Sequence, residues 1–292
     1  MKRGKSRRLF KKKKSHSNQR LGCIIAIIVL IPICYGLYLY YQQYSVQHSS
    51  KPQIETSVSL PTPSGKDLEI PVSLIPRQEQ IIRHKVYTVS YNKDLKIPNW
   101  VSYELTRQET KGKEKRGDNF IADPLVKGAI ATNADYARSG YDKGHMAPAA
   151  DMKWSPDVMK ESFYFSNMCP QHPQLNRRGW KNLEEKIRDW AVADSAIIII
   201  CGPIIDKPSK TIGKNKVAVP ERFFKVILSP FVKPARGIGF LFNNRQAVEP
   251  LSTYAVSIDS IEKLTHMDFF SPLPDEIENA VEANADYYQW PR

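Results

Sequence analysis

The sequence predicts an α+β fold with a central, mainly antiparallel sheet flanked by helices. Stretches rich in β-branched and aromatic residues occur both early and late in the chain, as at 84–91 and 196–201. Between and after them, apolar residues recur at helical spacing, most clearly over 176–193. The two kinds of segment are mixed rather than strictly alternating, which is typical of α+β domains and not of parallel α/β sheets.

The first two predicted strands form an antiparallel pair. His84–Tyr91 and Trp100–Leu105 both alternate between β-branched or aromatic residues and polar ones, and the polar segment Asn92–Pro98 connects them. A charged loop over 107–117 follows, with Arg116 near its end. Taken alone, an arginine in such a Lys/Glu-rich loop is a solvated surface charge.

The middle of the chain predicts a short helix, a strand and a break. Residues 154–160 form the helix, with Ser155 as its N-cap and Pro156 at the first helical position. Phe163–Asn167 is predicted to be a buried strand. The two prolines in Met168–Gln174 are expected to keep that segment irregular.

A longer helix is predicted from Asn176 to about Ala193. Asn176 stands at its entrance, where asparagine is a favoured N-cap, and capping is the simplest role for it. Glu184 lies two turns further on, at the edge of the apolar face, where a carboxylate is ordinary. The apolar face consists of Trp180, Leu183, Ile187, Trp190 and Ala191.

The last third of the chain predicts further strands and two short helices. Residues 196–201 are apolar on both faces, as in a central strand, and Gly202 and Pro203 end it. The elements predicted after it are strands at 222–229 and 237–242, a helix at 260–267 opened by a capping-box pattern of Asp259 and Glu262, and an acidic helix at 274–283.

The N-terminal segments differ in composition from the rest of the chain. Residues 1–20 contain ten Lys or Arg and no acid, so they carry ten of the thirteen net positive charges of the 292 residues. Residues 21–41 are uncharged, apolar and long enough to span a bilayer. The Pro- and Ser-containing segment 42–82 predicts a linker, and 83–292 the folded domain. The net charge therefore says little about what this domain binds.

These segments predict a single-pass membrane protein. The positive-inside rule places the basic tail in the cytoplasm and the folded domain outside it, in the periplasm or the extracellular space. A cleaved signal peptide is the competing interpretation, but no small-x-small cleavage site is evident. In an oxidising compartment Cys169 and Cys201 are permitted to form a disulfide, and two buried thiols fit the sequence as well.

The segment Tyr141–Asp151 holds the densest group of functional side chains. Its core, Asp142-Lys143-Gly144-His145, places an acid and a cation beside a glycine and a histidine, and Pro148 stops a helix from running through. We expect the histidine at the end of a short strand or on a loop, with its ring presented rather than packed. Alone, the motif is more simply a surface turn.

One histidine as general base and one hard cation suffice for phosphodiester hydrolysis. The sequence offers a histidine on a turn, an asparagine at a helix entrance and a carboxylate along that helix. A neutral histidine can take a proton from the attacking water, and Mg²⁺ needs only one or two protein oxygens. A zinc site is not predicted, since no second histidine and no cluster of acids accompany these three groups. No serine or cysteine occupies a recognisable nucleophile motif.

The sequence resembles the DNA/RNA non-specific endonucleases of the ββα-metal superfamily, the group that includes endonuclease G. The resemblance runs from about His84 to the final helices and leaves out the N-terminal segments. A spaced, ordered set of matches is far more specific than one motif. The matching segments are Ala131-Thr132-Asn133-Ala134-Asp135-Tyr136, Ser139-Gly140-Tyr141-Asp142-Lys143-Gly144-His145, Phe163 to Asn167, Pro170-Gln171, Leu175-Asn176, Trp180, Leu183-Glu184, Gly202-Pro203, Val217-Ala218-Val219-Pro220 and Phe223-Phe224-Lys225-Val226.

The resemblance implies a ββα-metal nuclease fold and a role for four polar side chains. His145 matches the general base of the family. Asn176 matches the direct protein ligand of the metal, Mg²⁺ or alternatively Mn²⁺, and Glu184 matches the acid that holds metal-bound waters. Asn167 matches an asparagine near the catalytic histidine, and we expect it to help orient the site.

Two basic residues complete the implied site. Arg116 resembles the arginine that binds the substrate and stabilises charge on the phosphorane-like state, and Arg107 is an alternative for this role. Lys143 stands where the family usually has arginine, and it keeps the charge but loses the planar, bidentate fork. If this position clamps a phosphate, affinity or rate is expected to be lower. Asp142 is interpreted as a structural residue that orients the turn.

Together with the membrane anchor predicted from residues 21–41, the resemblance implies a membrane-anchored, Mg²⁺-dependent endonuclease that cleaves DNA and RNA through phosphate contacts, leaving 5′-phosphate and 3′-hydroxyl ends. It also implies a homodimer. A catalytically weak, membrane-tethered nucleic-acid-binding module is the alternative that Lys143 suggests, although binding alone needs no general base. A third interpretation, a phosphodiesterase for small esters, keeps the same site but requires a closed pocket.

Overall fold

The computed structural model describes residues 68–205 and 210–292. The predicted basic tail, the apolar span and residues 42–67 of the linker lie outside this described part. Within it, no helix is both long and apolar enough to cross a membrane. Residues 68–82, predicted as the end of the linker, are folded, since β2 (Gln80–Arg83) is a strand of the main sheet. The linker is therefore shorter than predicted at its C-terminal end.

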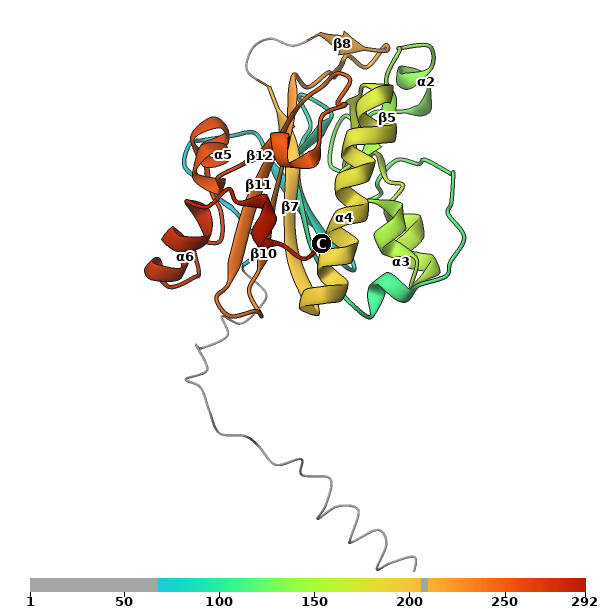
Figure 1. The fold of residues 1–292 in the computed structure, drawn as a ribbon. Helices are drawn as coiled ribbons and strands as arrows, with labels where there is room; N and C mark the ends of the chain where they lie inside the picture. The colour runs from blue at the N-terminus through green and yellow to red at the C-terminus, as the bar shows by residue number, and fades with distance from the viewer. Residues whose placement is uncertain (1–67, 206–209) are drawn as a thin grey trace, which may run out of the picture. The chain divides into compact units, whose positions relative to one another are not determined.

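An antiparallel sheet of seven strands organises the described residues (Figure 1). Besides β2, its strands are β3 Tyr87–Asn92, β4 Ile97–Thr106, β7 Ala196–Ile204, β10 Arg222–Ser229, β11 Arg236–Asn243 and β12 Ala255–Val256. They lie in the order β12-β11-β10-β7-β4-β3-β2. The predicted antiparallel pair, β3 and β4, is confirmed, and so is the central position of the strand that is apolar on both faces.

The side chains of β7 alternate between two hydrophobic cores, one on each face of the sheet. Ile197 and Ile199 belong to the core covered by α4 (Lys181–Asp194), and Ile198 and Ile200 belong to the opposite core. Each of the four is at most 2% exposed. Because burying one such side chain contributes roughly 1.5–3 kcal/mol, this strand alone supplies a hydrophobic term comparable to the net stability of a typical domain.

The layer on the α4 side of the sheet carries the candidate site. A two-stranded antiparallel ribbon of β5 (Asp142–His145) and β6 (Met168–Gln171) precedes α4, so that strand, strand and helix follow one another. The helix that starts after Ser155 with Pro156 in its first turn is confirmed. The other elements of the layer are α2 Asn133–Tyr136, η2 Ala149–Met152, α3 Pro156–Glu161, η3 Phe165–Asn167 and the π-helical η4 Leu175–Trp180.

Two predictions in this layer are wrong. Phe163–Asn167 is not a strand, since its last three residues form η3. The strand is the next segment, Met168–Gln171, which its prolines were expected to keep irregular. Pro170 is tolerated because a two-stranded ribbon leaves one edge of each strand unpaired, and a residue without an N–H can face that edge at little cost.

The helix that carries Asn176 also begins differently from the prediction. The chain winds as a π-helix over Leu175–Trp180, capped by Gln174, before the regular α4. Asn176 therefore lies inside the first turn and is not an N-cap; its side chain bonds instead to Asp142. π-helical turns are rare and frequently occur at functional sites.

The opposite face of the sheet is covered by α5 (Ile258–Thr265) and α6 (Asp275–Glu282), to the left of the sheet in Figure 1. The acidic helix α6 is confirmed. The predicted capping box is wrong: Ser257 caps α5, its Oγ accepting from Ser260 N at 3.2 Å. The remaining short elements are β1 Val72–Ser73, β8 Thr211–Ile212, β9 Val217–Ala218, β13 Met267–Asp268, η1 Glu109–Lys111, η5 Leu251–Tyr254 and η6 Tyr287–Gln289.

Cys169 and Cys201 are free, buried thiols, so the disulfide is not formed. The Cys201 thiol donates a hydrogen bond to the Met146 carbonyl oxygen at 3.2 Å. Burial raises the pKa of Cys201 to about 11, and it also raises the pKa of Cys169. Both side chains, Cys169 on β6 and Cys201 on β7, therefore act as small core residues and not as nucleophiles.

Candidate active site

His145 ends β5, as predicted, but its ring is packed rather than presented. The residue is 7% exposed. Its ring centroid lies 5.0 Å from that of Phe163, with the two planes at 87°, and 5.6 Å from that of Phe120. Its Nε2 atom is buried and has no hydrogen-bond partner among the described residues. A buried polar atom without a partner is uncommon and calls for an explanation.

The surroundings of His145 keep its imidazole neutral. Burial, followed by the positive charges of Arg116 and Lys143, lowers the pKa of His145 to about 3. Because this value lies far below neutral pH, the ring stays uncharged and keeps one nitrogen lone pair available. Before substrate binds, the two cations disfavour the imidazolium form, so the ring is neutral and can accept a proton during the reaction.

Gly144 is required by a close approach and not by a turn. It lies in β5 opposite Cys169, and a Cβ atom added to it would come within 2.6 Å of the Gln171 Cβ atom on β6. Any side chain at this position would push the two strands of the ribbon apart. The strand that ends in His145 therefore depends on the missing side chain of the residue before it.

Asn167 fixes the backbone that follows His145. Its Oδ1 accepts from Ala147 N at 2.9 Å, and its Nδ2 donates to the carbonyl oxygens of Ala147 and Ser162, each at 2.9 Å. The side chain is fully buried. Since these bonds occupy both ends of its amide, Asn167 acts by positioning the chain and does not touch a substrate.

Asp142 holds Asn176 in one orientation. The Asn176 Nδ2 donates to Asp142 Oδ2 at 3.0 Å, and Arg177 forms two bonds of 2.8 Å to the same carboxylate. This fork is the geometry that arginine prefers with carboxylates. The side-chain oxygen of Asn176, Oδ1, receives no hydrogen bond from any described residue. Asp142, predicted to orient a turn, instead orients the candidate metal ligand.

Glu184 stands in the first turn of α4 above a buried lysine. Burial raises the pKa of Glu184 to about 7, while Lys225 opposes this rise. Lys225 is fully buried on β10, with its Nζ 4.4 Å from the Trp180 ring centroid and no hydrogen-bond partner in the described chain. Its charge also acts on Asp151, which Arg188 and Tyr103 bind at 2.8 and 2.9 Å.

Arg116 and Lys143 place positive charge on either side of the histidine. Arg116 lies 5.4 Å from the Phe163 ring centroid, and Lys143 lies 4.2 Å from that of Phe120. These are the same two rings that contact His145. Arg107 is excluded as the alternative, because it donates to the Val192 carbonyl oxygen at the end of α4.

The sequence profile of the DNA/RNA non-specific endonuclease family matches residues 64–276. The chain belongs to this family. It is 30% identical over 250 residues to a protein named nuclease from Nostoc sp., covering 80% of this chain and 88% of that protein. Human mitochondrial endonuclease G is 33% identical over 213 residues, covering 67% and 71% of the two chains. The crystal structure of the EndoG/EndoGI complex superposes with a TM-score of 0.63 at 29% identity, covering 68% and 89%.

In this DNA/RNA non-specific endonuclease, electrostatic interactions and a hydrogen bond link the predicted residues. Arg116 and Lys143 act on His145, and Arg116 also acts on Glu184. The Trp180 indole donates to the His145 carbonyl oxygen at 3.2 Å, which ties the end of β5 to the helix carrying Asn176. The fold therefore brings together residues from the charged loop, the ribbon and the helix.

Sequence reasoning missed Lys225 and the two phenylalanines. Lys225 matched the family pattern, but no role was assigned to it. A signal did exist: in β10 it occupies the same face as Phe223 and Ile227, so alternation places it in the core. Phe163 was predicted only as part of a buried strand, and Phe120 received no role beyond its place four residues after Arg116.

We expect the Lys225→Met variant to shift the acidic limb of the activity–pH profile to higher pH. Methionine keeps the packing on Trp180 but removes the cation that opposes the raised pKa of Glu184. Glu184 is then protonated over a wider range, and activity at pH 7 falls. The measurement is kcat/KM from pH 5.5 to 9 at limiting Mg²⁺. The exposed Lys181→Met on α4 is the control, and an unchanged midpoint in Lys225→Met would contradict this role.

Proposed function

We propose that this chain is a Mg²⁺-dependent endonuclease that hydrolyses phosphodiester bonds in DNA and RNA. The observation that carries this proposal is the neutral, buried His145 between two cation-bearing aromatic rings. Such a group is suited to removing a proton next to an anionic phosphate. Membership of the nuclease family supports the same conclusion.

The donor set fits a magnesium ion. Asp142 fixes the Asn176 amide by accepting from its Nδ2, which leaves the carbonyl oxygen free to bind a cation. Glu184 adds a carboxylate that accepts no hydrogen bond from the described residues. Its pKa of about 7 means that it gains or loses its proton near neutral pH. Mg²⁺ keeps several of its waters and needs few protein oxygens, so Asn176 would bind it directly and Glu184 through water.

The residues of this chain then divide the reaction between them. The bound metal supplies charge neutralisation at the phosphate and at the leaving oxygen. Since Nε2 of His145 is sealed from solvent, we assign the base to Nδ1, which takes a proton from the attacking water. Arg116, which is exposed on its loop, would contact the phosphate and stabilise the negative charge that develops there. Lys143 would add positive potential as a point charge.

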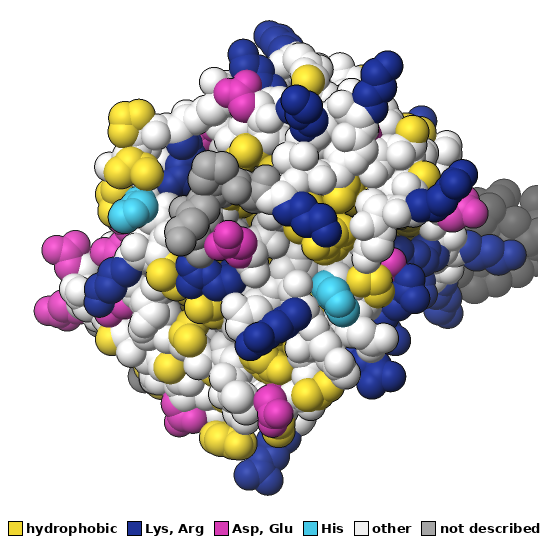
Figure 2. Space-filling view, turned by 90° about the horizontal axis from the view of Figure 1, so that it is seen from above, with side chains coloured by type: hydrophobic (Ala, Val, Ile, Leu, Met, Phe, Trp, Pro, Cys, Tyr) yellow, Lys and Arg dark blue, Asp and Glu magenta, His cyan; other side chains and the backbone are white. Residues whose placement is uncertain are grey.

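The surface offers phosphate contacts without base readout. Figure 2 views the end of the molecule that carries α2, β5 and β8, and lysine and arginine side chains are spread over it. The loop that carries Arg116 helps to form a groove whose lining includes Lys111, Lys113, Lys153 and Trp154, together with two acids, Glu109 and Glu114. Trp154 is 39% exposed, enough for a base to stack on it. Such contacts favour binding with little sequence preference.

We further propose that the enzyme is held at a membrane by residues 21–41, with residues 1–20 in the cytoplasm and the catalytic domain outside. The apolar, uncharged span and the basic tail before it support this orientation. A homodimer remains a prediction from the resemblance.

The test is cleavage by the full-length chain, purified in detergent, of supercoiled plasmid and of RNA. We expect both substrates to be degraded with Mg²⁺, no cleavage with EDTA, and recovery when excess Mg²⁺ is restored. A small aryl phosphodiester should turn over far more slowly than plasmid. Plasmid that is retarded in a gel but uncut, over a range of pH and divalent metals, would refute the enzyme and favour the tethered nucleic-acid-binding module.

A further inference from the structure

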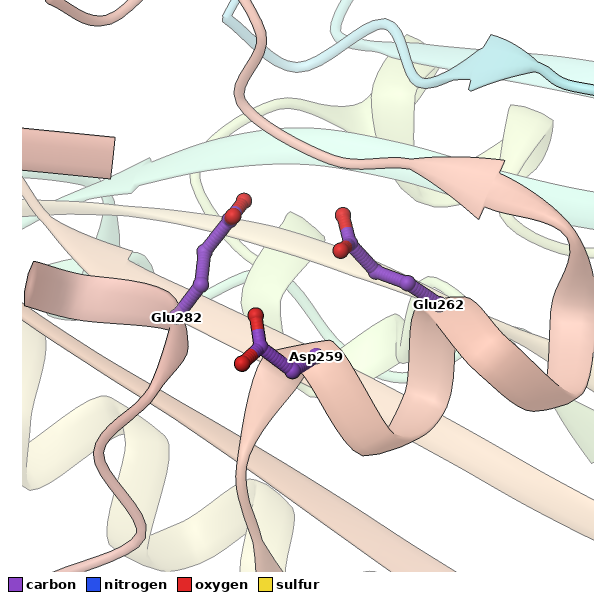
Figure 3. A group of neighbouring side chains, drawn as sticks. All are labelled: Asp259, Glu262 and Glu282. Carbon is purple, nitrogen blue, oxygen red and sulfur yellow. The ribbon is translucent and has the colours of Figure 1, made fainter. Parts of the chain in front are cut away.

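Five carboxylates converge on the face of the sheet opposite the candidate active site. We call them the carboxylate cluster: Asp259 and Glu262 of α5, Asp268 of β13, and Glu278 and Glu282 of α6. Oxygen atoms of the first two and Glu282 lie within 4.8 Å of one another, as do those of the last three. Figure 3 shows Asp259, Glu262 and Glu282 directed from two helices into one space.

Glu282 is the member of the cluster that demands an explanation. It is 6% exposed, and its Oε1 has no hydrogen-bond partner among the described residues. Burial, followed by the other four carboxylates, raises the pKa of Glu282 to about 9. The Oε1 of Glu278 is also buried without a partner. Burying carboxylates together without a cation is costly.

We propose that the carboxylate cluster is a calcium site. Its ligands would all be carboxylate oxygens, which suits a hard cation and not Zn²⁺. Ca²⁺ takes six to eight oxygens at about 2.3–2.6 Å in irregular geometry, so oxygens on opposite sides of it lie roughly 5 Å apart. The oxygen atoms of each group of three lie within 4.8 Å of one another, close enough to bind one cation together. Mg²⁺ fits less well, because it prefers one or two carboxylates and retains its waters.

Glu282 belongs to both groups of three, so it would be the central ligand. A cation there would join α5, β13 and α6, which already share a hydrophobic core, by offsetting the repulsion among their carboxylates. β13 pairs with β1, the first strand of the described chain. The site would therefore stabilise the region in which the chain enters the fold, and it is independent of the proposed nuclease chemistry.

The test is calorimetric titration of the metal-stripped, full-length chain with CaCl₂, together with its melting temperature. We expect wild type to bind Ca²⁺, and its Tm to rise by roughly 5–10 °C at calcium a hundredfold above the Kd. Binding should strengthen as pH rises from 6 to 8, since Glu282 must lose its proton first. Glu282→Gln should weaken binding at least a hundredfold and abolish the Tm rise.

The controls separate this site from the nuclease site and from surface charge. Glu276→Gln changes an exposed acid of α6 outside the cluster and should bind calcium as wild type does. Asn176→Ala should also retain the calcium-dependent Tm rise. Without calcium, Glu282→Gln should melt close to wild type, because glutamine resembles the protonated, neutral carboxyl group that a pKa of about 9 gives Glu282 at neutral pH, and this shows that it is folded. Equal calcium binding by wild type and Glu282→Gln would overturn the proposal.

Discussion

The His145→Ala variant is expected to lose nuclease activity by about two to four orders of magnitude in kcat, the usual contribution of a general base. The reason is structural as well as chemical. No other described histidine is placed between Phe120 and Phe163, with cations over both rings. Substrate affinity should change little, because Arg116 and Lys143 remain. The measurement is kcat and KM on plasmid at saturating Mg²⁺.

The pH profile of His145→Ala adds a second readout. With a pKa of about 3, His145 does not titrate in the working range. The acidic limb of the activity should therefore follow Glu184 and not His145, so His145→Ala should keep the wild-type midpoint while its kcat falls. Since Glu184 acts as a carboxylate, activity is present above that midpoint and is lost as pH falls through it. Bound metal will move the limb to lower pH.

His266→Asn is the matched control for this experiment. His266 is exposed, lies at the C-cap of α5 and has a left-handed backbone with φ of 53°, which asparagine tolerates. Its replacement should leave kcat unchanged. If His145→Ala retained more than a tenth of wild-type activity, the assignment of the base would be wrong.

The Asn176→Ala variant is expected to raise the Mg²⁺ concentration for half-maximal activity by at least a hundredfold. It removes the one carbonyl oxygen that we assign as a direct ligand. Asp142→Ala should raise it about 10- to 100-fold, because it removes only the group that orients the amide. The decisive measurement is direct titration with Mn²⁺ followed by its paramagnetic signal, in parallel with cleavage assays.

Gln174→Ala is the control for these metal variants, since Gln174 is exposed and precedes the same turn. It should bind metal as wild type does. Wild-type metal affinity in Asp142→Ala would show that the contact between Asp142 and Asn176 serves folding and not the metal. Wild-type affinity in Asn176→Ala would remove the proposed ligand altogether.

Much of the fold follows from local sequence. The strands β3, β4, β7, β10 and β11 were predicted close to their observed bounds, because β-branched alternation is a property of residues adjacent in the chain. The apolar stripe of α4 is local in the same way. The errors lie where the chain is short and irregular: β6 carries a proline, and η4 adopts a π-helical turn that no propensity predicts.

The sequence by itself also identified the candidate site residues, because His145, Asn176 and Glu184 stand in ordered motifs. Only the tertiary structure decided their orientation and their pKa values. Asp142 and Asn176 are 34 residues apart, yet they form one hydrogen-bonded unit. Lys225 of β10 is buried against the ring of Trp180 in η4. Burial and charge pairing set pKa values, and both depend on segments that only folding brings into contact.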